Sequence, residues 1–118
     1  MDEKIDKSFA KRILKDIIQN SSTSPTPEKI KTIVSRHFKI KVADMESAKR
    51  TNNIAFPRQV AMYLCREMTD YSLPKIGNLF GGRHYTTVMH ACDKIQEEMK
   101  QNESVAEVVK RLKKDISE

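Results

Sequence analysis

The sequence predicts an all-α fold: a compact helical domain that contains a helix-turn-helix and is preceded by a separate N-terminal helix. Apolar residues recur at spacings of three and four along the chain, which is typical of amphipathic helices. Only three glycines are present, and two of them are adjacent. A chain of 118 residues has room for one compact domain with an appendage, and it is too short for a large enzyme.

The first predicted helix covers residues 6–20, with Phe9, Ile13 and Ile17 on one side. The stretch SSTSPT at residues 21–26 then ends it, because Ser, Thr and Pro favour turns and extended chain over helix. We interpret this stretch as a linker, so that residues 1–20 belong to a different unit from the domain at residues 27–118.

The domain is expected to begin with a helix that Thr26 caps and Pro27 opens. Its apolar stripe consists of Ile30, Ile33, Val34 and Phe38. A short element at residues 42–48 and the polar loop KRTNN at residues 49–53 should follow.

The next helix is predicted over residues 56–68, with Val60, Ala61, Leu64 and Met68 on its core face. This pattern leaves Arg58 and Arg66 pointing toward solvent.

A short helix capped by Ser72 should direct Leu73, Ile76, Leu79 and Phe80 inward. Gly81 and Gly82 can adopt positive φ and so turn the chain sharply where this helix ends.

The helix that begins near Tyr85 should bury one apolar face, which consists of Val88, Ala91, Cys92, Ile95 and Met99. Its outer face is then Thr86, Thr87, His90 and Lys94. A last helix is predicted to open with a capping box from Ser104 to Glu107 and to bury Val105, Val108, Val109, Leu112 and Ile116.

The net charge of +6 is concentrated in the middle of the sequence. Residues 27–70 hold nine basic and five acidic side chains, and residues 71–95 hold three basic and one acidic. A basic stripe on a small domain favours a polyanionic partner, nucleic acid first and an anionic membrane second.

The sequence does not support a disulfide-rich, metal-binding, membrane-spanning or catalytic protein. Cys65 and Cys92 fall within predicted helices without a Cys-x-x-Cys pattern, and the three histidines lack the spacing of paired metal ligands, so neither a disulfide scaffold nor a metal site is expected. There is no apolar run of membrane-spanning length and no signal peptide. Paired carboxylates and nucleophile-base arrangements are also missing, so we expect no catalytic residues.

A short helix, a glycine turn and a second helix with a polar first turn form the arrangement of a helix-turn-helix, whose second helix enters the DNA major groove. Thr86 and Thr87 can hydrogen-bond base edges and pack methyl groups on thymine. His84 and Tyr85 stand at the helix start, where backbone N–H groups favour phosphate, and Arg83 could reach guanine or phosphate. The alternative is a two-helix hairpin whose polar residues only cap and solubilise it.

The loop KRTNN adds a second feature, because an arginine on a loop can enter a narrow minor groove with enhanced negative potential. Taken alone, it could equally be an ordinary solvated loop.

Three stretches, RTNNIAFPRQVAMYL at 50–64, SLPKIGNLFGGR at 72–83 and TTVMHACDKI at 86–95, together closely resemble the C-terminal DNA-binding domain (domain IV) of the DnaA family of bacterial chromosomal replication initiators. The resemblance covers about residues 27–117, with the three motifs in the family's order and spacing. It implies that residues 5–18 are the final helix of a preceding AAA+ ATPase module. That module is not in this chain, which has no phosphate-binding loop. No cofactor is therefore expected in this chain, and ATP and magnesium are expected only in the longer parent protein.

By this resemblance, Arg50 inserts into the minor groove, Gln59 assists from the start of its helix, and Arg83, Thr86 and Thr87 act in the major groove. The residues expected to line the duplex, mostly near phosphates, are Lys49, Arg58, Arg66, Leu73, Pro74, Lys75, His90 and Lys94. The family usually has Asp-His where this sequence has His84-Tyr85. A carboxylate accepts from the cytosine amino group. Neutral His can accept one hydrogen bond but has no second acceptor, and protonated His cannot accept at all, so the preferred site is expected to differ or relax.

The leading hypothesis is therefore an origin-binding domain that recognises a short double-stranded DnaA box to initiate chromosomal replication. It implies a cytoplasmic, nucleoid-associated bacterial protein that self-assembles through the AAA+ module of its parent. The alternatives are a diverged DnaA-like paralogue that binds another DNA site, and a helical protein-interaction domain with no role on DNA.

Overall fold

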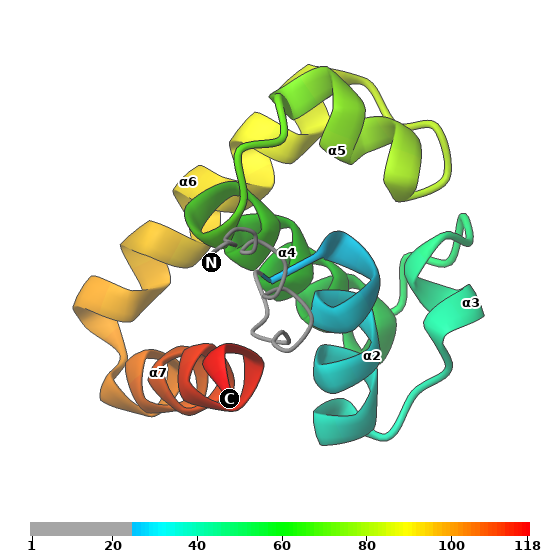
Figure 1. Ribbon diagram of the computed structural model, residues 1–118. Coiled ribbons are helices and arrows are strands. Elements are labelled where there is room, and N and C mark those ends of the chain that lie inside the picture. The colour runs from blue at the N-terminus through cyan, green and yellow to red at the C-terminus, as the bar shows by residue number, and fades with distance from the viewer. Residues whose placement is uncertain (1–24) are drawn as a thin grey trace, which may run out of the picture.

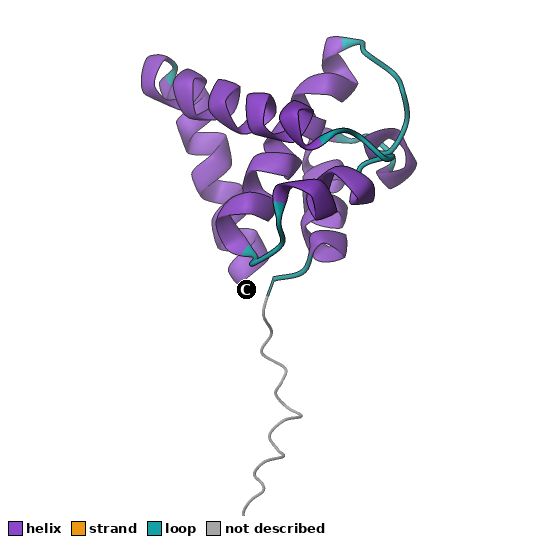
Figure 2. Ribbon diagram, turned by 90° about the horizontal axis from the view of Figure 1, so that it is seen from above, coloured by secondary structure: helices purple, strands orange, loops and turns teal. Residues whose placement is uncertain are grey.

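A computed structural model describes residues 25–118 of the chain, and this part is all-helical (Figure 1). The helices of the described part are α2 Pro27–Phe38, α3 Val42–Met45, α4 Asn52–Met68, α5 Leu73–Leu79, α6 Tyr85–Gln101 and α7 Glu103–Ser117. Viewed from above, helices joined by short loops make up the whole of this part (Figure 2). The predicted helix at residues 6–20 and most of the predicted linker lie outside the described residues.

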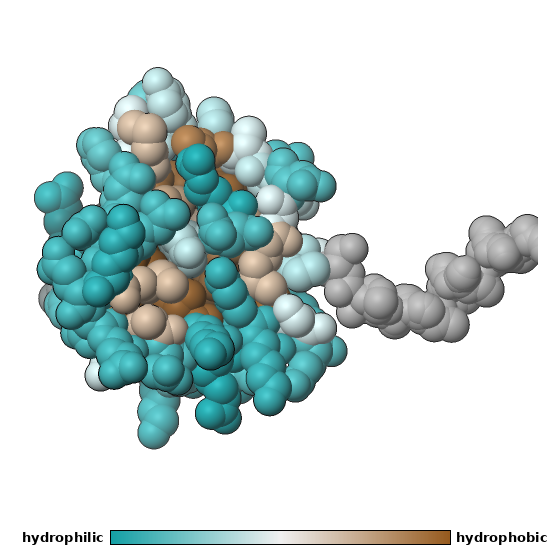
Figure 3. Space-filling model, turned by 90° about the vertical axis from the view of Figure 1, so that its left-hand side faces the viewer, coloured by the Kyte–Doolittle hydropathy of each residue, from teal (hydrophilic) through white to brown (hydrophobic). Residues whose placement is uncertain are grey.

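Helix α4 runs through the middle of the domain, with α2 on one side and α5 and α6 on another, while α7 closes the remaining side against α2 and α6 (Figure 1). The fully buried residues include Val60 and Leu64 on α4, Phe80 after α5 and Ile95 on α6. Burying side chains of this size contributes about 1.5–3 kcal/mol each. The face of the domain in Figure 3 is mostly hydrophilic, with hydrophobic side chains showing in patches between the polar ones.

The start of α2 agrees with the sequence prediction. Thr26 is the N-cap, its side chain accepts from the Lys29 amide at 3.2 Å, and Pro27 is the first helical residue. Ile30 and Val34 are fully buried, while Ile33 and Phe38 are half-buried against the core. The predicted stripe therefore faces the core as expected.

Helix α4 begins at Asn52, four residues before the predicted start at Phe56. The Ile54 and Ala55 amides donate to the Thr51 carbonyl at 2.9 and 2.8 Å, so the helix has already formed before Pro57. Pro57 therefore lies inside the helix, where it has no backbone N–H to donate to the Asn53 carbonyl. The loop predicted at residues 49–53 is correspondingly shorter.

Two other predicted boundaries are wrong by a few residues. The short element predicted over residues 42–48 is helical only to Met45, as α3. The capping box predicted at Ser104 does not form, because the Asn102 side chain already caps α7 by accepting from the Ser104 amide at 2.9 Å. Of the residues predicted to be buried by α7, Val109, Leu112 and Ile116 are fully buried, and Val105 and Val108 are half-buried.

The predicted turn between α5 and α6 is present. Ser72 caps α5 by accepting from the Lys75 amide at 3.3 Å. Gly81 and Gly82 have φ values of 84° and 74°, which confirms the positive φ expected of them. The two helices and this turn form the helix-turn-helix.

Candidate nucleic-acid interface

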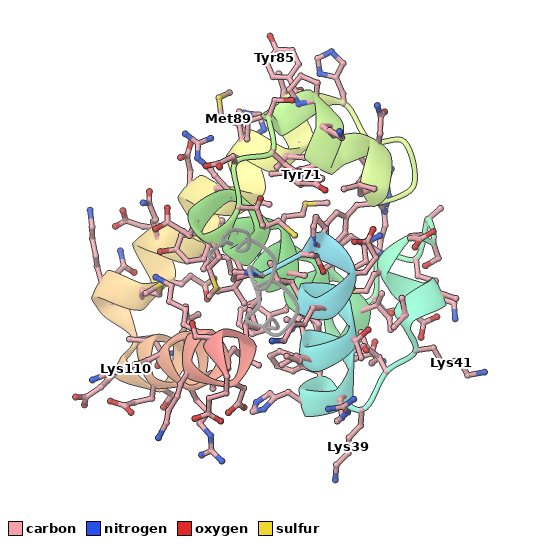
Figure 4. The ribbon with its side chains drawn as sticks, in the orientation of Figure 1. Lys39, Lys41, Tyr71, Tyr85, Met89 and Lys110 are labelled. Carbon is pink, nitrogen blue, oxygen red and sulfur yellow. The ribbon has the colours of Figure 1, made fainter. Side chains whose placement is uncertain are left out.

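Helix α6 presents the polar side chains predicted for its outer face. Thr87, His90 and Lys94 are exposed and Thr86 is half-buried, while Val88 and Ile95 on the opposite side are fully buried. The sequence places them this way because the apolar residues recur at helical spacing and one face must meet the core. Tyr85 opens the helix and its ring, 44% exposed, projects outward from the domain (Figure 4).

His84 caps α6 with its imidazole. Its Nδ1 atom accepts from the Thr86 amide at 3.2 Å and lies 2.9 Å from the Thr86 hydroxyl. A ring nitrogen that accepts carries no proton, so the neutral ring has its N–H at Nε2. The ring also lies 4.6 Å from that of Tyr85, in a tilted arrangement. His84 therefore supplies the helix cap and offers a hydrogen-bond donor on its far side.

The loop that carries Lys49 and Arg50 connects α3 to α4. Arg50 is exposed, and Lys49 Nζ lies 3.2 Å from the Asp44 carboxylate. The Lys41 backbone amide and Lys49 both hydrogen-bond the Asp44 side chain and lower the pKa of its carboxyl. Asp44 therefore remains charged and holds Lys49 at the base of the loop.

The prediction that Arg58 points toward solvent is wrong, since only 6% of this residue is exposed. Its guanidinium donates to the carbonyls of Met45 at 3.1 Å, Lys49 at 2.8 Å and Asp44 at 3.0 Å. Arg58 has the right spacing for the outer face of α4, but its long side chain reaches the end of α3 and the loop that follows it. Little of the Arg58 side chain is therefore accessible for the predicted contact with the duplex.

Two hollows join the α3–α4 loop to α6. The larger, of about 530 Å³, is lined by Arg50, Arg58 and Gln59 on one side and by Arg83 and Thr87 on the other. The smaller, of about 260 Å³, shares Arg58, Gln59, Arg83 and Thr87 and extends along α6 to His90 and Lys94. These seven predicted residues, from three separate segments, therefore form one continuous surface.

Positive charge predominates at this surface, where three arginines line the larger hollow together with one carboxylate, that of Glu46. Burial and the nearby Arg83 lower the pKa of Arg58, and burial and the nearby Arg50 lower the pKa of Arg83. Within residues 25–118, none of these three arginines is ion-paired with a carboxylate. Guanidinium groups remain charged at neutral pH, so the surface favours an anion.

The other predicted residues lie around this surface or away from it. Pro74 and Lys75 are exposed at the start of α5, where Lys75 Nζ lies 5.0 Å from the centre of the Tyr71 ring, and Leu73 is half-buried against the core. Arg66 is exposed near the end of α4 and lines neither hollow. Gln59 is half-buried, and its Oε1 atom is buried without a hydrogen-bond partner among the described residues.

Lys31 helps to hold the segments around this surface together, although its sequence position did not mark it as a residue of the site. Only 5% of it is exposed, and its ammonium lies 3.1 Å from the Glu46 carboxylate, hydrogen-bonds the Leu79 carbonyl and sits over the Phe80 ring. It ties α2 to the α3–α4 loop and to the end of α5. Its position three residues before Val34, within the apolar stripe of α2, was the available sign that it is buried.

The helix-turn-helix, its polar first turn and the arginines beside it define a domain of the nucleic-acid-binding type. Among its helices within residues 25–118, none has the length and hydropathy required of a membrane span. Nor do three His, Cys, Asp or Glu side chains come together in this part of the chain to hold a metal ion.

Comparison with known proteins agrees with this class. Residues 27–95 match the family described as "Bacterial dnaA protein helix-turn-helix". The chain therefore belongs to the bacterial DnaA helix-turn-helix family.

Relatives named "Chromosomal replication initiator protein DnaA" are similar over nearly the whole chain. The protein from Caldanaerobacter subterraneus subsp. tengcongensis is 52% identical over 112 residues, and that from Thermoanaerobacter sp. (strain X514) is 50% identical over the same length. Each match covers 95% of this chain and 25% of the relative, so the chain spans about a quarter of their length. A solved structure described as that of a DNA replication initiation factor has a TM-score of 0.67 and 33% identity, over 77% of this chain and 29% of that one.

Proposed function

We propose that this chain binds double-stranded DNA sequence-specifically, at a short DnaA box of a replication origin, and thereby serves the initiation of chromosomal replication. The observation that carries the proposal is the continuous surface on which Arg50, Thr87 and Lys94 meet, with no carboxylate paired to its arginines in the described residues. Membership of the DnaA family supports it independently.

In this proposal the first turn of α6 enters the major groove and the α3–α4 loop reaches the adjacent minor groove. Thr86 and Thr87 would read base edges, because a hydroxyl donates or accepts and its neighbouring methyl can pack on thymine. Arg50 would enter the minor groove. Lys75, Lys94 and the first-turn amides of α6 would contact phosphates, which position the protein without reading sequence.

The proposal extends to the longer parent protein that the family implies. There, an AAA+ module would bind ATP and magnesium and mediate self-assembly, and the protein would be cytoplasmic and associated with the nucleoid. This chain would supply the contact with the origin.

A titration of the protein on a duplex that carries the DnaA box, compared with a scrambled duplex at the same salt concentration, tests the proposal. We expect a clear preference for the box, and equal affinities would overturn the sequence-specific claim. Arg50→Ala should weaken binding and lower its salt dependence, whereas Thr87→Ala should mainly erode the preference among sequences. Arg111→Ala is the control, because Arg111 is an exposed arginine of α7 outside both hollows.

A protein-interaction domain without a role on DNA makes the opposite prediction. In that case Arg50→Ala and Thr87→Ala would leave the affinity for DNA unchanged.

The geometry of His84 favours a second candidate, a diverged relative that prefers a different DNA site. With Nδ1 engaged by the Thr86 amide, the neutral ring presents the Nε2 donor outward. A donor suits the acceptors of guanine or thymine, whereas the aspartate usual in the family suits the amino group of cytosine. Selection of preferred sites from a random DNA pool separates the two candidates, and recovery of the ordinary box would exclude the second.

A further inference from the structure

Arg83 connects the two elements that are proposed to meet DNA. Its Nη2 atom donates to the Ser47 carbonyl at 2.6 Å, and its Nη1 atom donates to the Phe80 carbonyl. Ser47 lies three residues before Arg50 on the α3–α4 loop, and Arg83 lies two residues before the start of α6. One guanidinium therefore joins the glycine turn to the loop across 36 residues of sequence.

The main chain reinforces this connection. A Cβ atom placed on Gly81 would lie 2.3 Å from the Glu46 carbonyl oxygen, so the glycine turn is in direct contact with the loop. In Figure 1 the turn after α5 lies beside the loop that follows α3. The two segments thus meet at two neighbouring points, through Gly81 and through Arg83.

We infer that Arg83 is a positioning residue, which sets the loop carrying Arg50 at a fixed distance and angle from α6 so that one duplex can meet both. The inference rests on the proposed DNA-binding function and assigns Arg83 a different role from the base contact that the family resemblance implies. Two of the five N–H donors of Arg83 are engaged by the Phe80 and Ser47 carbonyls and hold the guanidinium against the loop, so removing the side chain would release the loop.

This role predicts coupling between Arg83 and the minor groove. The loop is held from the other side by Arg58, which bonds the carbonyls of Asp44, Met45 and Lys49. Arg83 is the side chain that holds it toward α6. Without Arg83, Arg50 would remain charged and near the DNA but would no longer be placed in register with the α6 contacts.

Base analogues can distinguish contacts in the minor groove from contacts in the major groove. Replacing adenine by 2,6-diaminopurine adds an amino group to the minor groove and leaves the acceptor and donor of the major-groove edge in place, whereas 7-deazaguanine removes an acceptor from the major groove only. We would measure the loss of affinity that each analogue causes in box DNA for the wild type, Arg50→Ala, Arg83→Ala and Arg83→Gln, with Arg111→Ala as the control.

For the wild type and Arg111→Ala, diaminopurine in the minor-groove segment should weaken binding by roughly tenfold, the effect of one lost base contact. For Arg50→Ala and both Arg83 variants, we expect that penalty to fall to about twofold or less, while the 7-deazaguanine penalty stays near its wild-type value. The double variant Arg50→Ala/Arg83→Ala should lose less affinity than the two single losses together, because both changes remove the same contact.

A base-reading Arg83 would give the reverse result, with the diaminopurine penalty retained and the 7-deazaguanine penalty lost, and that result would overturn the inference. A wild-type protein that prefers the box without any diaminopurine penalty would also overturn it. Failure of the proposed function would look different, since the wild type would then not prefer the box at all. Arg83→Gln retains a polar side chain and gives the same comparison should Arg83→Ala fail to fold.

Discussion

The imidazole of His84 performs a structural task that a short polar side chain usually performs. Its Nδ1 atom accepts the Thr86 amide at the start of α6, where the first backbone N–H groups of a helix have no partner within the helix. The same residue stands at the edge of the proposed DNA surface. A substitution there therefore affects both the stability of α6 and the groups that are presented to a duplex.

His84→Ala should lower the free energy of unfolding by about 1 kcal/mol, because it removes the cap, while His84→Asp should retain most of it, since aspartate is among the best caps. Urea unfolding of the three proteins measures the difference. No loss for His84→Ala would show that the cap contributes nothing, and an equal loss for both variants would show that aspartate does not replace it. On DNA, the second candidate predicts that His84→Asp shifts the preferred sequence toward the ordinary box, which the same site selection would detect.

Arg58 holds the α3–α4 loop from within. Arg58→Met keeps the apolar stem but leaves the carbonyls of Asp44, Met45 and Lys49 without their donor, and should lower the free energy of unfolding by about 2–4 kcal/mol. Arg66→Met on the same helix is the matched control, because Arg66 is exposed and its loss should stay within about 0.5 kcal/mol. Similar losses for the two variants in urea unfolding would contradict the structural role of Arg58.

For single residues, helical spacing predicted which face of a helix each Cα atom occupies, but it did not predict where the charged group of a long side chain lies. Val60, Leu64 and Ile95 are buried as predicted. Arg58 was assigned to solvent because its Cα lies on the polar face. Its actual partners are main-chain carbonyls at the end of α3 and in the loop that follows, which the periodicity of α4 does not place. Long cationic side chains often differ from their Cα in environment, since the stem can pack while the head finds a partner.

The glycine turn shows how one element is fixed to another. Both Gly81 and Gly82 have positive φ, but a Cβ on Gly81 would meet the Glu46 carbonyl oxygen at 2.3 Å, whereas a Cβ on Gly82 would meet no atom within 4 Å. The two positions therefore separate the cost of backbone conformation from the cost of displacing the loop.

Gly82→Ala should destabilise the domain by roughly 1–2 kcal/mol, the cost of a left-handed conformation for an ordinary residue. Gly81→Ala should cost clearly more and should also weaken DNA binding, because the loop must move. Thermal unfolding and the box titration, run on both variants, check this. Equal destabilisation together with unchanged DNA affinity would contradict the close contact between turn and loop.

Helix order, the glycine turn and the capped starts of α2 and α5 could be predicted from the sequence, because capping residues, glycines and apolar spacing are local features. The starts of α4 and α7 could not. Asn52 is a weak helix former, so local propensity does not predict that α4 begins there, although Ile54 two residues later is buried. Asn102 and Ser104 are both good caps, and the chain uses the earlier one. The contact of the loop with α6, which makes the site, depends on packing between distant segments.

For the molecule as a whole, two buried thiols link stability to alkaline pH. Burial raises the pKa of Cys65 from 9.0 to about 12 and that of Cys92 from 9.0 to about 11. In the unfolded chain both thiols titrate near their ordinary value, so only the unfolded state loses these protons as the pH first rises above it. Their contribution is complete below about pH 9 and is lost progressively as the pH rises toward the folded-state values.

The free energy of unfolding should therefore fall between about pH 8 and about pH 10, and should fall less steeply in the double variant Cys65→Ala/Cys92→Ala. Urea unfolding at the two pH values gives both slopes. The double variant will be less stable at each pH because it removes buried volume, and only the slopes bear on the prediction. Identical slopes would show that the thiols do not contribute.

Two arginines hold the end of α3 and the α3–α4 loop through main-chain carbonyls. Arg58 and Arg83 bind the carbonyls of Asp44, Met45, Ser47 and Lys49, and every amino acid provides a carbonyl at such a position. Substitutions at exposed loop positions such as Ala48 and Arg50 would thus change which bases are touched without changing where the loop is held. In the proposed complex, the side chains that would touch bases are thus separate from the main-chain contacts that aim the loop.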